Sequence, residues 1–194
     1  MTDQQPIKGV GTMIKSIGVI GAGQMGNGIA HVCALNGFNV VLSDLSQEQL
    51  DKAVKTIDGN LSRQLARGKI SEVDRAATMA RITPSTDLKA LADVDLVIEA
   101  ATEDEAVKRK IFAGVCQVVR PDTLLATNTS SISVTRLAAT TDRPEKFMGM
   151  HFMNPVPVMQ LVELIRGIAT DESTFREIRE LTIKLGKTPA NAED

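Results

Sequence analysis

Aromatic side chains are scarce in this sequence: it has neither Trp nor Tyr, and aromatic residues make up 3% of its 194 residues. It also lacks an excess of positive charge, since its formal net charge is -2. A protein that holds nucleic acid needs basic groups along the phosphates, or rings on which bases stack. The two deficits therefore argue against a nucleic acid partner.

Cysteine is rare as well, with Cys33 and Cys116 far apart in apolar helical patterns. Neither has a second Cys or His at ligand spacing, so we expect core thiols, no metal site and no disulfide framework. No apolar run reaches the length of a membrane span, and the first residues resemble neither a signal peptide nor a transit peptide. The sequence thus predicts a cytoplasmic protein with no membrane partner.

The hydrophobic residues, 43% of the chain, are enough for the core of one large domain. We expect a flexible N-terminal extension over residues 1–13 and a domain over 14–194. Short apolar runs alternate with amphipathic stretches, which is typical of α/β proteins with a mainly parallel sheet. Strands are expected at Lys15–Ile20, Asn39–Ser43, Arg81–Ser85, Leu96–Ala100, Leu124–Thr127, Phe147–Phe152 and Met159–Ile165. Helices are expected at Gln24–Asn36, Ser46–Gly68, Ser71–Met79, Glu105–Val119, Ser133–Ala139 and Asp171–Leu185.

Two of these helices, Ser46–Gly68 and Ser71–Met79, form a polar pair longer than a crossover between strands requires. We therefore expect a helical hairpin that protrudes from the sheet. Ser46 and Gln49 have the spacing of a capping box at its start.

A glycine-rich motif, G-A-G-Q-M-G, lies between the first predicted strand and its helix. In such a motif the first Gly permits a tight turn, the second lets a pyrophosphate approach the backbone, and the third allows the helix to pack on the strand. A helix N-terminus favours the negative charge of that group. The motif predicts a doubly wound, Rossmann-type fold, with a purely structural loop as the alternative. The candidate cofactor-binding residues of the loop are Gly21, Gly23, Gln24, Met25 and Gly26.

Asp44 ends the second predicted strand, at the distance from the glycines where an acidic residue accepts hydrogen bonds from the adenosine ribose. Its carboxylate would repel a 2′-phosphate. We therefore expect NAD as the cofactor in preference to NADP.

His151 and Glu163 lie at equal distances from a turn near Val156 and Pro157, if the two strands around them form a hairpin. The two side chains would then face each other. Imidazole suits proton transfer near neutral pH, and a carboxylate on its second nitrogen fixes the tautomer, as the oxidation of an alcohol requires. The alternative is a histidine that only satisfies the end of a sheet; His31 is interpreted as a packing residue.

Two further groups of polar residues follow predicted strands. Asn128 and Ser130 come directly after an apolar strand, where hydroxyls could reach a substrate oxygen, although they could also cap the next helix. Glu103 and Lys108 lie just beyond Leu96–Ala100, at a place suited to ribose hydroxyls, and a solvated helix start is their alternative.

Three motifs together resemble one family: G-A-G-Q-M-G-N-G-I-A at 21–30, N-T-S-S-I-S at 128–133 and H-F-M-N-P-V-P-V-M-Q-L-V-E at 151–163. From Ile14 to Asp194 the chain is similar to L-3-hydroxyacyl-CoA dehydrogenases, and particularly to the bacterial 3-hydroxybutyryl-CoA dehydrogenases. The resemblance implies reversible hydride transfer between the 3-hydroxyl of an acyl-CoA and NAD. Two positions depart from the usual motifs, because Met153 stands in place of a Phe and Asp104 in place of an Asn.

The resemblance also implies a role for each candidate residue. His151 would be the general base, Glu163 its orienting partner, and Ser130 a hydrogen-bonding partner of the reacting oxygen. The residues that it places at ligands are Asn128 and Asn154 on the nicotinamide side, Glu103 and Lys108 at the cofactor ribose, and Arg67 and Lys69 at the CoA phosphates.

The match stops before the P-G-F-x-x-N-R segment and the helical C-terminal domain of the family, which supply a catalytic Asn and most of the homodimer interface. We therefore expect this chain to bind NAD but to turn over poorly on its own. An NAD-binding module without catalysis, or another NAD-dependent hydroxy-acid dehydrogenase, is the alternative.

Overall fold

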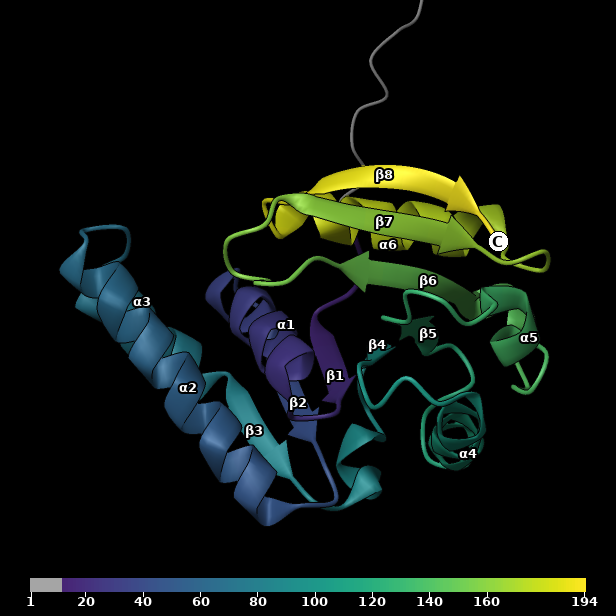
Figure 1. Ribbon diagram of the computed structural model, residues 1–194, viewed down its shortest axis with the longest axis horizontal. Helices are drawn as coiled ribbons and strands as arrows, with labels where there is room; N and C mark the ends of the chain where they lie inside the picture. Colours follow the sequence, from purple (N-terminus) through teal and green to yellow (C-terminus); the bar gives the residue numbers. More distant parts are fainter. Residues whose placement is uncertain (1–11) are drawn as a thin grey trace, which may run out of the picture.

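The computed structural model describes residues 12–194 and contains one eight-stranded sheet in the order β3-β2-β1-β4-β5-β6-β7-β8 (Figure 1). The strands from β1 to β6 are parallel, β7 is antiparallel to β6, and β8 is parallel to β7. The bounds of the strands are β1 Ser16–Ile20, β2 Asn39–Ser43, β3 Ile82–Ser85, β4 Leu96–Glu99, β5 Leu124–Thr127, β6 Phe147–Phe152, β7 Leu161–Arg166 and β8 Thr188–Glu193.

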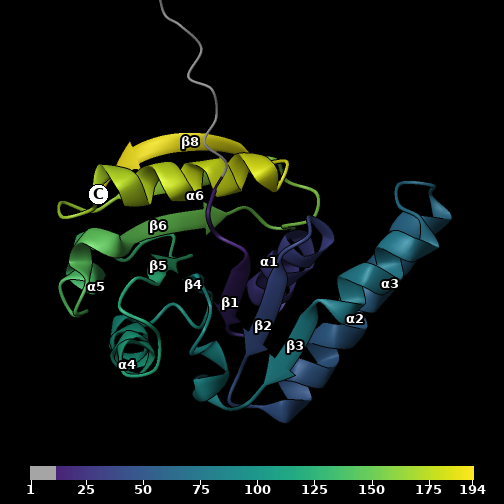
Figure 2. The ribbon, with the colours of Figure 1, turned by 180° about the vertical axis from the view of Figure 1, so that it is seen from behind.

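Helices cover both faces of the sheet (Figures 1 and 2). Buried residues of α1, α2 and α6 belong to one apolar cluster, and those of α4, α5 and the short helix η1 belong to a second. The bounds of the helices are α1 Gln24–Leu35, α2 Gln47–Ala66, α3 Glu72–Ala80, η1 Leu88–Leu91, α4 Glu105–Cys116, α5 Val134–Ala138, η2 Pro144–Lys146 and α6 Glu172–Lys184.

The predicted doubly wound sheet is confirmed. From β1 the chain first builds outward through β2 to β3, and then returns to the other side of β1 with β4. At this reversal the connections after β1 and β4 leave in opposite directions, which opens a crevice at the carboxyl ends of the two strands. Because both faces are covered, a strand such as β4 is buried along its whole length.

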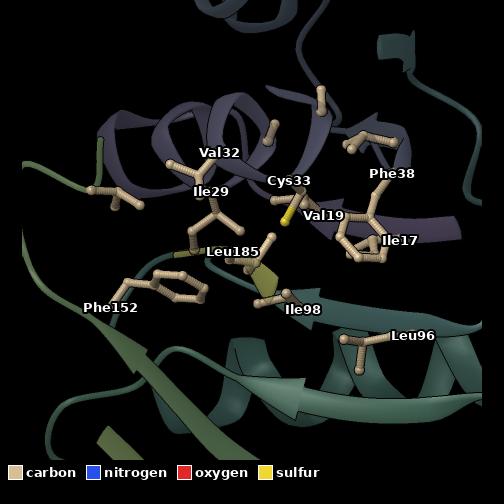
Figure 3. Packing of buried hydrophobic residues seen from close by; sticks show 14 of the residues in the cluster. Ile17, Val19, Ile29, Val32, Cys33, Phe38, Leu96, Ile98, Phe152 and Leu185 are labelled. Carbon is tan, nitrogen blue, oxygen red and sulfur yellow. The ribbon is translucent and has the colours of Figure 1, made fainter. Parts of the chain in front are cut away.

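The larger apolar cluster joins the first helix to the last one. Figure 3 shows Ile29 and Cys33 of α1 above Ile98 of β4, with Phe152 of β6 and Leu185 at the end of α6 beside them. Cys33 has no exposed surface, and its burial raises the pKa of the thiol to about 12. It is therefore a neutral core residue, as expected, while Cys116 is half-buried.

The predicted helical hairpin consists of α2 and α3, which project from one end of the sheet (Figure 1). Ser46 caps α2 by accepting a hydrogen bond from the Gln49 amide. In a capping box the Ser46 amide would donate to the Gln49 side chain. Here it donates instead to the Asp44 carboxylate at 2.9 Å. A charged carboxylate is a stronger acceptor than a Gln side chain. A complete capping box forms instead at α3, between Ser71 and Asp74.

Strand β8 was not predicted, because T-P-A-N-A-E contains a Pro and few of the β-branched and aromatic residues that favour strands. Its ladder with β7 extends the sheet by one strand. Just beyond β8, the Asp194 carboxylate accepts hydrogen bonds from the Ser133 hydroxyl and from the amides of Val134 and Thr135. The end of β8 is thereby tied to the start of α5.

The predicted N-terminal extension, residues 1–13, falls mostly on residues 1–11, which lie outside the described residues. Of the remainder, the Thr12 hydroxyl and the Met13 amide both donate to the Glu177 carboxylate of α6 at 2.9 Å. These two residues therefore contact the domain.

Asp194→Asn should lower the melting temperature at about pH 7, and less so near pH 2. Partial burial raises the pKa of Asp194, but the hydrogen bonds from Ser133, Val134 and Thr135 outweigh it and hold the pKa at about 2. The stabilisation is therefore complete above the unfolded pKa and is lost as the pH falls through the folded one. Thermal unfolding followed by circular dichroism measures it, with the exposed Glu193→Gln as control. An equal deficit at both pH values would contradict this account.

Candidate functional site

The glycine motif has the local geometry that its spacing predicts. Gly21 adopts φ +100°, and a Cβ at this position would lie 2.5 Å from the Ala100 carbonyl oxygen. A Cβ on Gly26 would lie 1.6 Å from the Gly21 oxygen, so the first turn of α1 could not approach β1. At Gly23, in contrast, a Cβ would meet nothing within 4 Å. The loop is therefore open to a ligand at its middle glycine.

The amino end of α1 is also the one α-helix start among residues 12–194 without a side-chain cap. Its N-cap is Gly23, and its first turn holds no acidic residue. Amide groups and the positive end of the helix dipole are thus left free for an anionic group. This end of α1 fits the pyrophosphate of a dinucleotide.

Asp44 is held rigidly beside the glycine loop. One carboxylate oxygen accepts the Ala22 amide at 2.8 Å and the other the Ser46 amide at 2.9 Å. A fixed carboxylate in this place can accept ribose hydroxyls and repels a phosphate. The cavity next to it, of about 430 Å³, is lined by Gly21, Gly23, Gln24, Met25, Asp44, Gln49, Ala100, Ala101 and Thr102. The predicted cofactor residues around Asp44 are therefore brought together.

A second cavity of about 460 Å³, also lined by Asp44, is mainly apolar. Leu88 of η1 and Val107 and Ile111 of α4 form part of its wall. The volume and apolar character of this cavity suit a purine ring. Sequence reasoning missed these residues. No local signal marks them, since the pattern of η1 and α4 is that of ordinary packing residues.

His151 and Glu163 are directly paired across the antiparallel ladder of β6 and β7, so the predicted hairpin register is confirmed. The His151 Nδ1 and the Glu163 Oε2 are 2.8 Å apart. A carboxylate can only accept, so in the neutral ring the proton lies on Nδ1 and the lone pair on Nε2. The His151 side chain is 20% exposed, and its Nε2 makes no hydrogen bond within residues 12–194. The pair therefore presents a basic nitrogen at the carboxyl end of β6.

The segment after β5 lies against the same end of β6, because the Asn128 side-chain oxygen accepts the Phe152 amide at 2.8 Å. The alternative that Asn128 or Ser130 caps the next helix is wrong, since Ser133 fills that role at α5. Ser130 is exposed, and its hydroxyl donates no hydrogen bond within the part of the chain that the structure describes. It is free to contact a ligand.

A buried charged cluster supports this loop from behind. Lys108 is 1% exposed and its ammonium contacts both oxygens of Glu99, which is fully buried at the end of β4. Glu103 lies 3.9 Å from the same ammonium, and it accepts hydrogen bonds from the Thr129 hydroxyl and the Ser130 amide. Burial raises the pKa of Glu99, although the neighbouring Lys108 favours its charged form. The cluster thus joins β4 and α4 to the serine loop.

Lys108 therefore does not fit the alternative of a solvated helix start, and its expected place at the cofactor ribose stays a prediction. Its ammonium is engaged behind Glu103 instead of facing open space. Glu103, with 42% of its side chain exposed, is the member of the pair that a ligand can reach. Sequence reasoning missed Glu99, although an acidic residue that ends the apolar run L-V-I-E is a signal that could have found it.

Arg67 and Lys69, at the tip of the helical hairpin, are exposed and line a cavity of about 340 Å³ with Arg63. Pro155, Pro157 and Val158, from the turn between β6 and β7, form its opposite wall. Asn154, which precedes this turn, is exposed. The cavity has a basic side and an apolar side, so it fits an anionic ligand with an apolar arm.

His31 is fully buried, and its Nε2 lies 3.2 Å from the Gln64 side chain of α2. Burial lowers the pKa of the ring, although the hydrogen bond with Gln64 opposes this. The interpretation of His31 as a packing residue is therefore confirmed.

Residues 16–194 match the family model described as 3-hydroxyacyl-CoA dehydrogenase, NAD binding domain. The chain belongs to this family. NAD is therefore the cofactor of the domain, and the glycine loop, the uncapped α1 and Asp44 fit it. None of the helices in residues 12–194 is long and apolar enough to cross a membrane.

Individual relatives agree with this assignment. The chain is 58% identical over 182 residues to a 3-hydroxybutyryl-CoA dehydrogenase of Bradyrhizobium diazoefficiens, covering 94% of this chain and 62% of the relative. The crystal structure of (S)-3-hydroxybutyryl-CoA dehydrogenase from Ralstonia eutropha superposes with a TM-score of 0.92 at 46% identity, covering 93% of this chain and 64% of the other. A fatty acid oxidation complex subunit alpha of Idiomarina loihiensis is 43% identical over 93% of this chain and 25% of its own length. The chain thus spans less than two thirds of these relatives.

Asp44→Asn should weaken NAD binding by about tenfold and narrow the preference over NADP, because it removes a charged acceptor and the repulsion of a 2′-phosphate. The amide oxygen can still accept one of the two backbone N–H groups, so the loop should stay folded. Titration of both cofactors by calorimetry measures the effect, with the exposed Asp122→Asn as control. If the unaltered chain binds NADP as tightly as NAD, the role of Asp44 is refuted.

Glu99→Gln should destabilise the domain by about 3 kcal/mol, because it leaves the Lys108 ammonium buried without its closest counter-charge. The double variant with Lys108→Met should recover part of this loss, since both buried charges are then removed. Urea unfolding of the single and double variants measures the coupling. Strictly additive losses would show that the pair is not coupled.

Proposed function

We propose that this domain provides the NAD site and the general base of a 3-hydroxyacyl-CoA dehydrogenase. The substrate would be a short acyl-CoA such as 3-hydroxybutyryl-CoA, whose 3-hydroxyl is oxidised reversibly to a 3-oxo group. The observation that carries the proposal is the hydrogen bond of 2.8 Å between His151 and Glu163, at the same edge of the sheet as the glycine loop. The names of the relatives support the substrate class.

In the oxidation, Nε2 of His151 would accept the proton of the 3-hydroxyl. Glu163 holds the ring so that this nitrogen carries the lone pair, and its negative charge stabilises the imidazolium that forms. When bound, NAD would supply the acceptor for the hydride that leaves carbon 3 of the substrate. The Ser130 hydroxyl would donate a hydrogen bond to the reacting oxygen, which becomes a carbonyl.

Other polar residues would hold the cofactor in place. Asn128 contacts the carboxyl end of β6, and Asn154 follows that end along the chain. We assign both residues to the nicotinamide side of the cofactor. Glu103 would accept a ribose hydroxyl, with Lys108 as the support that keeps its carboxylate in position. This assignment rests on the exposure of Glu103 and on the burial of Lys108.

The basic cavity between the hairpin and the β6–β7 turn would take the phosphates of coenzyme A. Arg67 and Lys69 supply the positive charge on one side, and the proline-containing turn offers an apolar surface to the rest of the ligand. Phosphates bind readily to clustered basic side chains. The acyl thioester would then extend toward His151.

Further parts of the enzyme would come from a segment that corresponds to the remaining length of the relatives. Such a segment would close over the thioester, exclude water and supply the homodimer interface, so the domain alone should turn over slowly. We place the protein in the cytoplasm, and in fatty acid β-oxidation because one relative is named as a subunit of a fatty acid oxidation complex.

The decisive test follows NADH consumption with acetoacetyl-CoA, for this domain alone and for the domain joined to the C-terminal part of a relative. The joined protein should be active, and His151→Gln should lower kcat by about 10²- to 10⁴-fold with an unchanged Kd for NAD. Glu163→Gln should lower it less, because Nε2 is still present.

Full activity of the His151→Gln protein would overturn the role of His151 as the base. A joined protein that binds NAD and coenzyme A but never reduces the substrate would instead favour a binding module without catalysis. Activity on a free hydroxy acid, in place of the thioester, would favour another NAD-dependent hydroxy-acid dehydrogenase.

A further inference from the structure

Lys187 is a buried charged residue that has no role in the proposed reaction. It follows Gly186, which ends α6 with φ +71° and turns the chain back toward the sheet. Lys187 is 8% exposed, and its ammonium donates to the carbonyl oxygens of Val156 at 2.6 Å and Met159 at 2.7 Å. The ion pairs within residues 12–194 do not include it.

Burial lowers the pKa of Lys187, and the titratable groups that interact with it electrostatically are Cys33 and His31, neither of which is a carboxylate. A buried ammonium without a carboxylate is costly unless it is hydrogen-bonded, so its charge-assisted hydrogen bonds to the two carbonyl oxygens are strong restraints on the residues that accept them. Both of its acceptors belong to residues 155–159, here called the proline turn. The partners of Lys187 thus lie in one short segment between β6 and β7.

The proline turn is fixed at three places. Within it, the amides of Val158 and Met159 both donate to the Pro155 carbonyl at 3.0 Å. On one side, Val156 is buried against α1, where a Cβ on Gly28 would lie 2.8 Å from the Val156 Cβ. Lys187 provides the third fixation, from a position 31 residues beyond Val156 in the chain.

The turn adjoins elements of both proposed ligand sites but forms a wall of one of them. Its first part follows His151 by a few residues along the chain, and Val156 packs on the helix that begins at the glycine loop. Its outer side chains, Pro155, Pro157 and Val158, form one wall of the basic cavity, of which Lys187 itself is not a part. Any movement of the turn therefore changes the width of that cavity.

We propose that Lys187 is a positioning residue, which holds the proline turn as the wall of the coenzyme A site without touching the ligand. The inference rests on the proposed function, because it takes the basic cavity to be the site of coenzyme A. Its effect should be selective, since the cofactor loop and Asp44 are held by other hydrogen bonds.

Three variants separate this role from a general loss of stability. Lys187→Met keeps the length of the side chain but removes its donors, whereas Lys187→Arg keeps donors and charge. Lys184→Met removes an exposed lysine from the end of α6 and serves as the matched control. Calorimetric titration of this chain with coenzyme A and with NAD gives the two dissociation constants.

Lys187→Met should weaken coenzyme A by about tenfold and leave NAD within about twofold, because two charge-assisted hydrogen bonds are lost from one wall only. Lys187→Arg should recover most of the loss, and Lys184→Met should change neither constant. If the unaltered chain binds coenzyme A, an unchanged affinity in Lys187→Met overturns the proposal. So does an equal loss for both ligands, since that is the result of a purely structural role.

Amide hydrogen exchange tests the inference independently of the proposed function. In Lys187→Met the Val158 and Met159 amides should exchange about tenfold faster, while that of Leu164 in β7 stays protected. If the unaltered chain does not bind coenzyme A, the assignment of the cavity fails, yet faster exchange still supports the hold of Lys187 on the turn. Unchanged exchange overturns it. If Lys187→Met does not fold, Lys187→Gln takes its place in the titrations and in the exchange measurement. Its side chain is shorter and neutral but keeps two donors.

Discussion

The hydrogen bond between the His151 Nδ1 and the Glu163 carboxylate is the interaction on which the proposed function of this domain depends. It exists because β6 and β7 are paired antiparallel in one register, which a slip of one residue would destroy by turning one side chain to the other face. The carboxylate leaves the lone pair on Nε2. An ordinary strand pairing thereby converts an imidazole into a base of defined orientation.

The other ligand-facing segments share a feature with this pair, because each is held by a polar group behind it. The glycine loop is tied to Asp44, the segment after β5 to Phe152 and the Glu103 cluster, and the proline turn to Lys187. Such groups are costly to bury unless their hydrogen bonds are made. A site built in this way is rigid before its ligands arrive, which suits a reaction that needs donor and acceptor carbons in contact.

Much of the fold could be predicted from local sequence patterns, and the physical reason differs from one element to another. Gly21 and Gly26 are recognisable because their positions admit no side chain, and strands such as β1 and β4 because a sheet covered on both faces requires continuous apolar runs. The pairing of His151 and Glu163 could be predicted because the two residues lie at equal distances along the chain from one turn. Strand β8 could not, because an edge strand of low intrinsic preference forms only where β7 offers an unpaired edge.

The sequence by itself determined the residues to which we assign the chemistry: the glycine loop, Asp44, His151 and Glu163 all belong to motifs whose spacing is local. Only the tertiary structure decided how these residues are supported. It brought Lys187 to the proline turn and attached Asp194 to α5. The physical reason is that a catalytic pattern lies within one or two neighbouring elements, whereas a buried polar group finds its partner across the fold, where no spacing along the chain records it.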